Sequence, residues 1–380
     1  MIALAAAMLF DGATLHDRRV VTIDDGRIVT IADRAPAGVA VETLPEDAVL
    51  APGFVDLQVN GGGGVLFNDD PSAERLRHIA AAHARLGTTS LLPTLISGPP
   101  PLRRAAMAAV RDALAAGVPG IAGLHLEGPF IAPARRGIHP RAHLAQPTEA
   151  DLAAMRAPFP APLLLTLAPD LVPPDAVAAL AEAGVSVFLG HADATLEQAA
   201  AALAAGARGF THLYNAMSQL GSRAPGMVGA ALDSATATAG IIIDGLHVHP
   251  AAIRLAFARL GPTRLFLVSD AMPTVGDDAA TAGFVLDGRR IRLADGRLTD
   301  DAGTLAGAHL SMAEAVRNAV RLVGLPLAAA LGMASATPAA CIGLADRGRI
   351  AAGARADLVA LDAELRVIAV WQGGQRLAPA

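Results

Sequence analysis

Short apolar runs recur through the middle of the chain, and each run ends in polar residues and is followed by an alanine-rich stretch. Buried parallel strands read as continuous apolar runs of this kind, and eight units of strand followed by helix are typical of a (β/α)8 barrel. We therefore predict an α/β fold with a TIM-like barrel at residues 50–345. The eight predicted strands are 53–59, 89–95, 120–127, 163–170, 185–191, 209–215, 239–245 and 264–270.

The two ends of the chain show shorter, strand-like patterns instead. Residues 19–31 (RVVTIDDGRIVTI) predict a hairpin with an Asp-Gly turn. Residues 356–362 and 367–372 predict two further strands near the C-terminus. The simplest arrangement is a small β-sandwich domain formed by residues 1–49 and 346–380, with the barrel inserted between these two segments.

Three further stretches need their own interpretation. Residues 281–297 contain FVLDGRRIRLADGR, which predicts a β-hairpin inserted after the eighth strand. Residues 322–345 carry no charge and are long enough to span a membrane, but glycine and proline interrupt them, so we predict two short packed helices. Residues 1–10 are apolar without a preceding basic residue, which favours a strand over a signal peptide. We therefore expect a cytoplasmic protein without a membrane partner.

Composition narrows the possible chemistry. Hydrophobic residues make up 53% and charged residues 17% of the chain, which is too apolar for a disordered protein. The net charge is −5 and no basic block occurs, which argues against a nucleic-acid partner. All 30 basic residues are arginine, so a Schiff-base lysine and a carbamylated lysine between two metals are excluded. The single cysteine, Cys341, excludes an internal disulfide and a cysteine-based zinc site.

Polar side chains gather at the ends of the predicted strands, where the active sites of such barrels lie. Glu127, His191 and His212 end strands three, five and six. Two imidazoles and one carboxylate that leave a position open form a catalytic zinc site, which can activate water and polarise a carbonyl. A single histidine would more often be a core residue, but three candidate ligands at one barrel mouth favour a metal. The other polar residues at strand ends are Asp56, Gln58, Asn60, His125, Asn215, Asp244, His247 and Asp270.

Several of these strand ends lie in distinctive motifs, namely PGFVDLQVNGGGG (52–64), HLEGPF (125–130), TLAPD (166–170), GHADAT (190–195), THLYNAM (211–217), DGLHV (244–248) and SDAM (269–272). Together they resemble the N-acetylglucosamine-6-phosphate deacetylases of the amidohydrolase superfamily. The resemblance implies a barrel of the metal-dependent hydrolase type with a small β domain. It also implies hydrolysis of N-acetylglucosamine 6-phosphate to glucosamine 6-phosphate and acetate, in amino-sugar catabolism and cell-wall recycling, by a homodimer.

The resemblance further implies roles for particular residues. Glu127, His191 and His212 would bind one divalent metal per subunit, for which we expect Zn2+, with Fe2+, Co2+ or Mn2+ as alternatives. Asp270 would act as general base and acid, and His139 in GIHP (137–140) would polarise the carbonyl group. The residues implied to hold the sugar phosphate are Asn215, Ala216, Arg223 and His247.

Two departures from the superfamily pattern stand out. The usual His-x-His after the first strand is replaced by Gln58-x-Asn60, and no lysine is present to bridge two metals. We therefore predict that Gln58 and Asn60 mark a vacant second-metal position, as in the single-metal branch of these deacetylases. Asp193 stands where asparagine is more usual, so it either adds charge near the metal or caps the following helix.

Other interpretations remain open at this stage. Asp56 is predicted to brace the first strand, and His125 to support a metal ligand from behind. Gly61–Gly64 could cradle a phosphate through backbone N–H groups or simply form a loop. Two alternatives to the deacetylase are an N-acyl-amino-acid deacylase and a catalytically inactive barrel that serves as a scaffold. The sequence does not distinguish N-acetylglucosamine from N-acetylgalactosamine phosphates.

Overall fold

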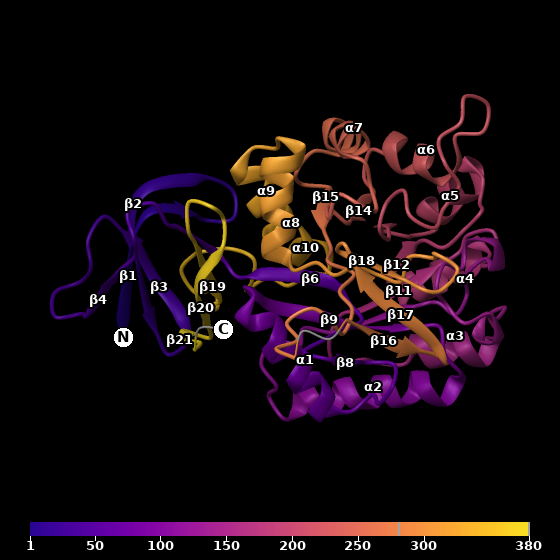
Figure 1. The fold of residues 1–380 in the computed structure, drawn as a ribbon, viewed down its shortest axis with the longest axis horizontal. Coiled ribbons are helices and arrows are strands. Elements are labelled where there is room, and N and C mark those ends of the chain that lie inside the picture. Colours follow the sequence, from indigo (N-terminus) through magenta and orange to yellow (C-terminus); the bar gives the residue numbers. More distant parts are fainter. Residues whose placement is uncertain (280–281, 379–380) are drawn as a thin grey trace.

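Strands from both termini form one mixed sheet beside the barrel in the computed structural model, which describes residues 1–279 and 282–378 (Figure 1). Strand β5 pairs antiparallel with β19, so that Val49 lies opposite Leu361. A separate apolar cluster that includes Leu4, Leu9 and Trp371 fills this part of the molecule. The strands are β1 (Ile2–Phe10), β2 (Leu15–Asp24), β3 (Arg27–Ala32), β4 (Val41–Thr43), β5 (Val49–Pro52), β19 (Leu358–Leu361), β20 (Val367–Gln372) and β21 (Gln375–Arg376).

This arrangement confirms the predicted β domain that both termini build. The predicted hairpin is also confirmed, because β2 and β3 pair up to Asp24 and Arg27. The two turn residues, Asp25 and Gly26, have φ values of 45° and 72°, as a tight turn between twisted strands requires. The domain boundaries stay predictions: β5 runs across the predicted boundary after residue 49, and residues 379–380 lie outside the described part of the chain.

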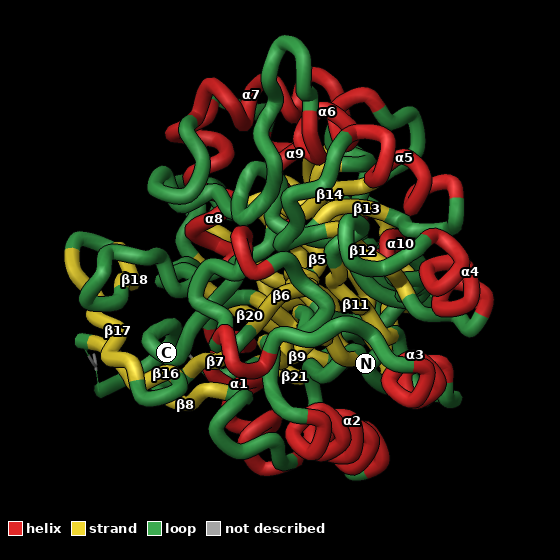
Figure 2. Tube along the Cα trace, turned by 90° about the vertical axis from the view of Figure 1, so that its right-hand side faces the viewer, coloured by secondary structure: helices red, strands yellow, loops and turns green. Residues whose placement is uncertain are grey.

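Eight parallel strands form the barrel, in the predicted order along the chain, and helices surround them (Figure 2). They are β6 (Phe54–Val59), β9 (Thr88–Ile96), β10 (Leu124–Glu127), β11 (Leu163–Leu167), β12 (Ser186–Leu189), β13 (Gly209–Phe210), β14 (Thr238–Ile241) and β15 (Leu265–Leu267). Each overlaps one of the predicted strands, so the predicted fold class is confirmed. The outer helices are α1 (Ala73–Arg85), α2 (Pro100–Ala115), α3 (Glu149–Arg156), α4 (Pro174–Glu182), α5 (Leu196–Ala204), α6 (Gly226–Asp233), α7 (Pro250–Leu260) and α8 (Met312–Asn318).

The first and last barrel strands meet mainly through side chains and a single bridge. The backbone N–H of Asn60 donates to the carbonyl of Ala271 at 2.9 Å, where Val59 and Ala271 form an isolated parallel bridge. One layer deeper, Asp56 accepts hydrogen bonds from the backbone N–H and the hydroxyl of Ser269. Asp56 therefore braces the first strand, as predicted, by linking it to the eighth.

The insertion after the eighth strand has three strands, one more than the predicted hairpin. They are β16 (Gly283–Leu286), β17 (Arg289–Ala294) and β18 (Arg297–Thr299). The short third strand lacks a period-two pattern and forms because a second tight turn, Asp295-Gly296, follows β17. Arg289 donates a hydrogen bond to the carbonyl of Ile138, so the insertion touches the loop that carries His139. Residue 281 of the predicted hairpin lies outside the described residues.

The long uncharged run near the C-terminus folds as predicted into short helices. Its main elements are α9 (Leu327–Ala334) and α10 (Ala336–Cys341), preceded by a π-helical turn at Ala319–Val323. Both helices contribute buried residues to the large apolar core of the barrel. Within residues 1–279 and 282–378, no helix combines the length and the apolar character needed to cross a membrane.

Candidate active site

The C-terminal ends of the barrel strands surround a cavity of about 450 Å³, a size that suits a small-molecule ligand. Most of the predicted site residues line it. Gln58 reaches the same place through hydrogen bonds to Glu127 and Asp270, whereas Arg223 does not belong to the lining. The predicted residues in the lining are Asn60, Glu127, His139, His191, His212, Asn215, Ala216, His247 and Asp270.

Glu127, His191 and His212 bring their potential ligand atoms together. Glu127 Oε1 lies 3.2 Å from His191 Nε2 and 3.0 Å from His212 Nε2, and the two Nε2 atoms are 3.0 Å apart. Ligand atoms about 2.0–2.1 Å from a tetrahedral zinc ion are separated from one another by about 3.4 Å. The three buried atoms therefore have nearly the spacing of one face of such a tetrahedron.

The hydrogen bonds of His191 indicate that a cation fits among these atoms. The carbonyl of Arg135 accepts from His191 Nδ1 at 2.8 Å, so the neutral ring carries its proton on Nδ1 and a lone pair on Nε2. That lone pair faces Glu127 Oε1, which is also an acceptor. Two buried acceptors repel each other unless a proton or a cation lies between them, so the residues present fit a divalent metal.

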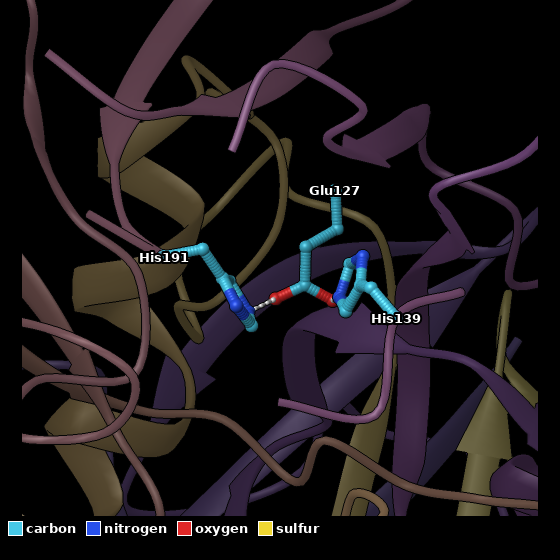
Figure 3. Close-up of side chains that lie close together, drawn as sticks. All are labelled: Glu127, His139 and His191. Carbon is cyan, nitrogen blue, oxygen red and sulfur yellow. Dashed lines mark hydrogen bonds and ion pairs between the residues drawn. The ribbon is translucent and has the colours of Figure 1, made fainter. Parts of the chain in front are cut away.

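His139 lies on the other side of the Glu127 carboxylate (Figure 3), with 3.7 Å between His139 Nε2 and Glu127 Oε2. The backbone N–H of Ser97 donates to His139 Nδ1 at 3.2 Å, so the neutral ring carries its proton on Nε2. Burial, reinforced by the charge of His191, lowers the pKa of His139 to about 4. Although His139 belongs to the same close cluster as Glu127 and His191, it offers an N–H donor rather than a lone pair. It therefore suits polarisation of a carbonyl better than metal ligation.

Asp270 faces the same cavity from the end of the eighth strand. Its Oδ1 accepts hydrogen bonds from Gln58 Nε2 at 3.1 Å and from Asn60 Nδ2 at 2.6 Å. Burial raises the pKa of Asp270 to about 6, and the charge of Glu127 adds to this effect. A carboxyl group with such a pKa can both accept and return a proton near neutral pH.

Asp244 supports His247, a role that the sequence analysis missed. Asp244 Oδ2 accepts from His247 Nδ1 at 2.6 Å, and Oδ1 accepts from the backbone N–H groups of Leu246 and His247, both at 2.8 Å. Burial raises the pKa of Asp244, but the hydrogen bonds from His247 and Leu246 and the charge of His247 together outweigh burial, so the net shift is downward. His247 is thus held with Nε2 as its remaining polar atom. The Asp-x-x-His spacing at the end of a strand was the available signal.

The arginines near the site differ from the prediction. Arg223 is exposed on the loop before α6, whereas Arg135, which the sequence analysis did not single out, lines the cavity. Arg135 Nη2 lies 2.8 Å from Asp193 Oδ1, so Asp193 holds this arginine near the cavity. The expected helix cap at Asp193 is wrong, because the Thr195 side chain caps α5 by accepting from the backbone N–H of Gln198.

Two further interpretations are settled by hydrogen bonds. His125 bonds to Thr94 at 3.1 Å and to Thr166 at 2.8 Å, rather than to a predicted metal ligand.

In the loop Gly61–Gly64, the backbone N–H groups of three glycines donate to carbonyls within 271–275. These N–H groups cannot also cradle a phosphate, so the glycine loop ties the end of the first strand to the segment that follows Asp270.

Unusual backbone conformations concentrate at the site. His191, His212, Ala216 and Asp270 have positive φ values of 48°, 30°, 50° and 51°. The left-handed region costs a residue with a side chain about 1–2 kcal/mol, and such residues persist where the surrounding structure fixes them, often at functional sites. The backbone at these strand ends is therefore in an unfavourable conformation, and the side chains that it places line the cavity.

Comparisons with known proteins identify the relatives of this chain. Residues 49–377 match the sequence profile of the amidohydrolase family. The chain is 43% identical to an N-acetylgalactosamine-6-phosphate deacetylase of Shewanella sp. (strain ANA-3), over 99% of this chain and 96% of the relative. It is 35% identical to an N-acetylglucosamine-6-phosphate deacetylase of Haemophilus influenzae, over 86% of each.

A solved structure extends the similarity to three dimensions. The N-acetylglucosamine-6-phosphate deacetylase of Pasteurella multocida superimposes with a TM-score of 0.95 at 34% identity, and 99% of each chain is covered. Because the family profile covers most of the sequence and relatives exceed 30% identity over nearly its full length, the chain belongs to the amidohydrolase family of metal-dependent hydrolases.

Proposed function

We propose that this chain hydrolyses the acetamide of N-acetylglucosamine 6-phosphate to give glucosamine 6-phosphate and acetate. The observation that carries the proposal is the set of three convergent ligand atoms on Glu127, His191 and His212, beside the carboxyl group of Asp270. Relatives with this activity in their names support the substrate class. N-acetylgalactosamine 6-phosphate is the second candidate substrate, because a relative named for it is 43% identical over nearly the whole chain.

Glu127, His191 and His212 would hold one divalent ion, and we propose Zn2+ because two imidazoles and one carboxylate are a common catalytic zinc set. A bound ion supplies a Lewis acid that acidifies water and polarises a carbonyl. Fe2+, Co2+ and Mn2+ fit the same donors. Gln58 and Asn60 offer amide groups in place of imidazoles, which supports a single ion per subunit.

The side chains of this chain would carry out the proton transfers. The Nε2–H of His139 donates to the acetamide oxygen, where negative charge develops during attack. Asp270 accepts a proton from the attacking water as the carbon–oxygen bond forms. It then returns that proton to the amide nitrogen as the carbon–nitrogen bond breaks, which releases acetate and leaves the amine on the sugar.

The sugar phosphate would be held at the outer part of the cavity. Asn215, Ala216 and His247 line it, and Asp244 fixes the ring of His247. Arg223 remains a proposed phosphate ligand on an exposed loop. Assembly as a homodimer, cytoplasmic location and a role in amino-sugar catabolism and cell-wall recycling stay predictions.

A hydrolysis panel on protein of known metal content tests the proposal. The substrates are N-acetylglucosamine and N-acetylgalactosamine, each with and without the 6-phosphate, together with N-acetyl amino acids. We expect metal-dependent release of acetate, fastest from a 6-phosphate sugar. Preference for N-acetyl amino acids would indicate the deacylase alternative, and no hydrolysis by metal-loaded protein would indicate a binding or scaffold protein.

A further inference from the structure

Gln58 and Asn60 stand where metal-binding histidines are usual in the superfamily. Here their side-chain amides form hydrogen bonds to two carboxylates instead. Both residues are almost completely buried, with 2% and 1% of their surface exposed. Gln58 Nε2 donates to Glu127 Oε1 at 3.0 Å and to Asp270 Oδ1 at 3.1 Å, and Asn60 Nδ2 donates to Asp270 Oδ1 at 2.6 Å. Each hydrogen of the Gln58 amide therefore has its own carboxylate acceptor.

The partners fix the orientation of the Asn60 amide. Rotating it by half a turn would place its carbonyl oxygen against a carboxylate oxygen of Asp270, and two acceptors at this distance repel. The observed orientation leaves Asn60 Oδ1 buried without a hydrogen-bond partner among residues 1–279 and 282–378. An apolar side chain would leave no buried acceptor unpaired. We therefore attribute the presence of asparagine at position 60 to the hydrogen bond that its NH2 group donates.

All side-chain donors that reach Asp270 reach the same oxygen. Oδ1 accepts from both amides, while no hydrogen bond to Oδ2 occurs within the described residues. Asp270 also lines the cavity. The carboxylate is therefore held by one oxygen, and the other is available to a ligand or a water molecule in the cavity.

We infer that Gln58 and Asn60 are positioning residues that hold Asp270 by Oδ1 and so make Oδ2 the oxygen that accepts and returns the proton. The second hydrogen of the Gln58 amide, on Glu127, sets the separation between this base and the metal-binding carboxylate. Two neutral amides thus keep two buried carboxylates side by side without a second cation. The inference rests on the proposed function, because it specifies which oxygen acts in that reaction.

Asn60→Leu tests the inference, because Asn60 touches Asp270 but makes no hydrogen bond to Glu127, His191 or His212. We expect kcat for the 6-phosphate sugar to fall about 10- to 100-fold, KM to stay within about twofold, and metal content to stay at one ion per chain. Asn318→Leu is the matched control, since Asn318 Nδ2 donates to the carbonyl of Ile243 at 2.9 Å, away from Asp270. It should lower the melting temperature and keep kcat within about twofold.

A double-mutant cycle identifies the route of the effect. If Asn60 acts through Asp270, adding Asn60→Leu to Asp270→Asn should lower kcat by less than about twofold. A full multiplicative loss in that background, an unchanged kcat in the single variant, or loss of the metal would overturn the inference. If Asn60→Leu does not fold, Asn60→Ala, which removes the donors without adding a charge, replaces it with the same expectations. Failure of the proposed function is distinct, because the wild-type protein itself would then release no acetate from either sugar phosphate.

Discussion

The position of single protons decides what the imidazoles of this site can do. His191 and His139 flank the same carboxylate of Glu127 (Figure 3), yet their neutral rings are opposite tautomers. A carbonyl faces Nδ1 of His191, and a backbone N–H faces Nδ1 of His139. One ring therefore presents a lone pair and the other an N–H donor, in line with the proposed roles of His191 in metal binding and His139 in carbonyl polarisation.

The proposed base can be tested by removing its charge. Asp270→Asn should keep the fold and the metal, because Asp270 does not belong to the proposed ligand set. It should lower kcat about 10²- to 10⁴-fold with little change in KM, as measured by steady-state kinetics and elemental analysis. Loss of the metal would identify Asp270 as a ligand, and a near-normal kcat would transfer the proton-transfer role to another group, with His139 first.

The pKa of Asp270 also predicts a pH dependence. A general base must be ionised, so activity is present above its pKa and is lost as the pH falls through it. Burial raises this pKa to about 6, and a cation beside the carboxylate lowers it. The value of kcat/KM for metal-loaded protein should therefore decline on the acidic side with a midpoint at or below about pH 6. A midpoint above pH 7, with metal content verified at each pH, would contradict this assignment.

At the scale of elements, the junction between the first and last barrel strands depends on a buried acid. Burial raises the pKa of Asp56 to about 7, even though hydrogen bonds from Ser269 oppose the shift. The folded chain therefore keeps this proton up to about pH 7, whereas the unfolded chain loses it near pH 4. The resulting stabilisation is complete below about pH 4 and is lost as the pH rises through about 7.

Asp56→Asn should weaken the dependence of the free energy of unfolding on pH between pH 4 and 7. The amide keeps the shape of the protonated acid and does not titrate, so its free energy of unfolding should fall less between pH 4 and 7 than that of the wild type. Denaturant unfolding across this range measures the difference. Asp33→Asn, the same change at a side chain that is 83% exposed, is the control and should follow the wild-type curve. An Asp56→Asn curve as steep as the wild-type one would exclude Asp56 as the source.

Two side chains are candidates to bind the phosphate, namely Arg223 on the loop before α6 and His247 in the cavity lining. Arginine is the natural planar partner of a phosphate, but Arg223 is exposed and outside the cavity lining, whereas His247 lies within it. Arg223→Ala and His247→Ala should each raise KM for the phosphorylated sugar and change little for the unphosphorylated one. An equal loss on both substrates would make the residue structural instead.

Periodicity predicted every barrel strand and the hairpin at Asp25-Gly26, because those elements are encoded by neighbouring residues. It predicted only two of the three strands in the insertion, since β18 is three residues long.

The sequence also predicted which strand ends carry polar site residues, but not the residues to which these side chains bond. Gln58 bonds to a residue 69 positions away and Asn60 to one 210 positions away, and these contacts exist only once the barrel closes. Arg135 and Asp193 are 58 positions apart for the same reason.

At the scale of the whole molecule, a barrel closed by parallel strands carries the site, and both termini fold into a separate sheet at its side (Figure 1). The strands bring the three proposed metal ligands from separate positions in the sequence to one point. The first strand ends in Gln58 and Asn60, whose amides stand where the proposed second-metal position would need imidazoles. We therefore propose a hydrolase that uses one metal ion per chain.

Metal titration of the metal-free protein tests this claim most directly. Zn2+ is added in steps, and acetate release from N-acetylglucosamine 6-phosphate and from N-acetylgalactosamine 6-phosphate is followed alongside bound metal per chain. Activity should be negligible without metal, rise in proportion to the first equivalent and level off at one ion per chain. Full activity in the metal-free protein, or activity that follows a second equivalent, would contradict the account.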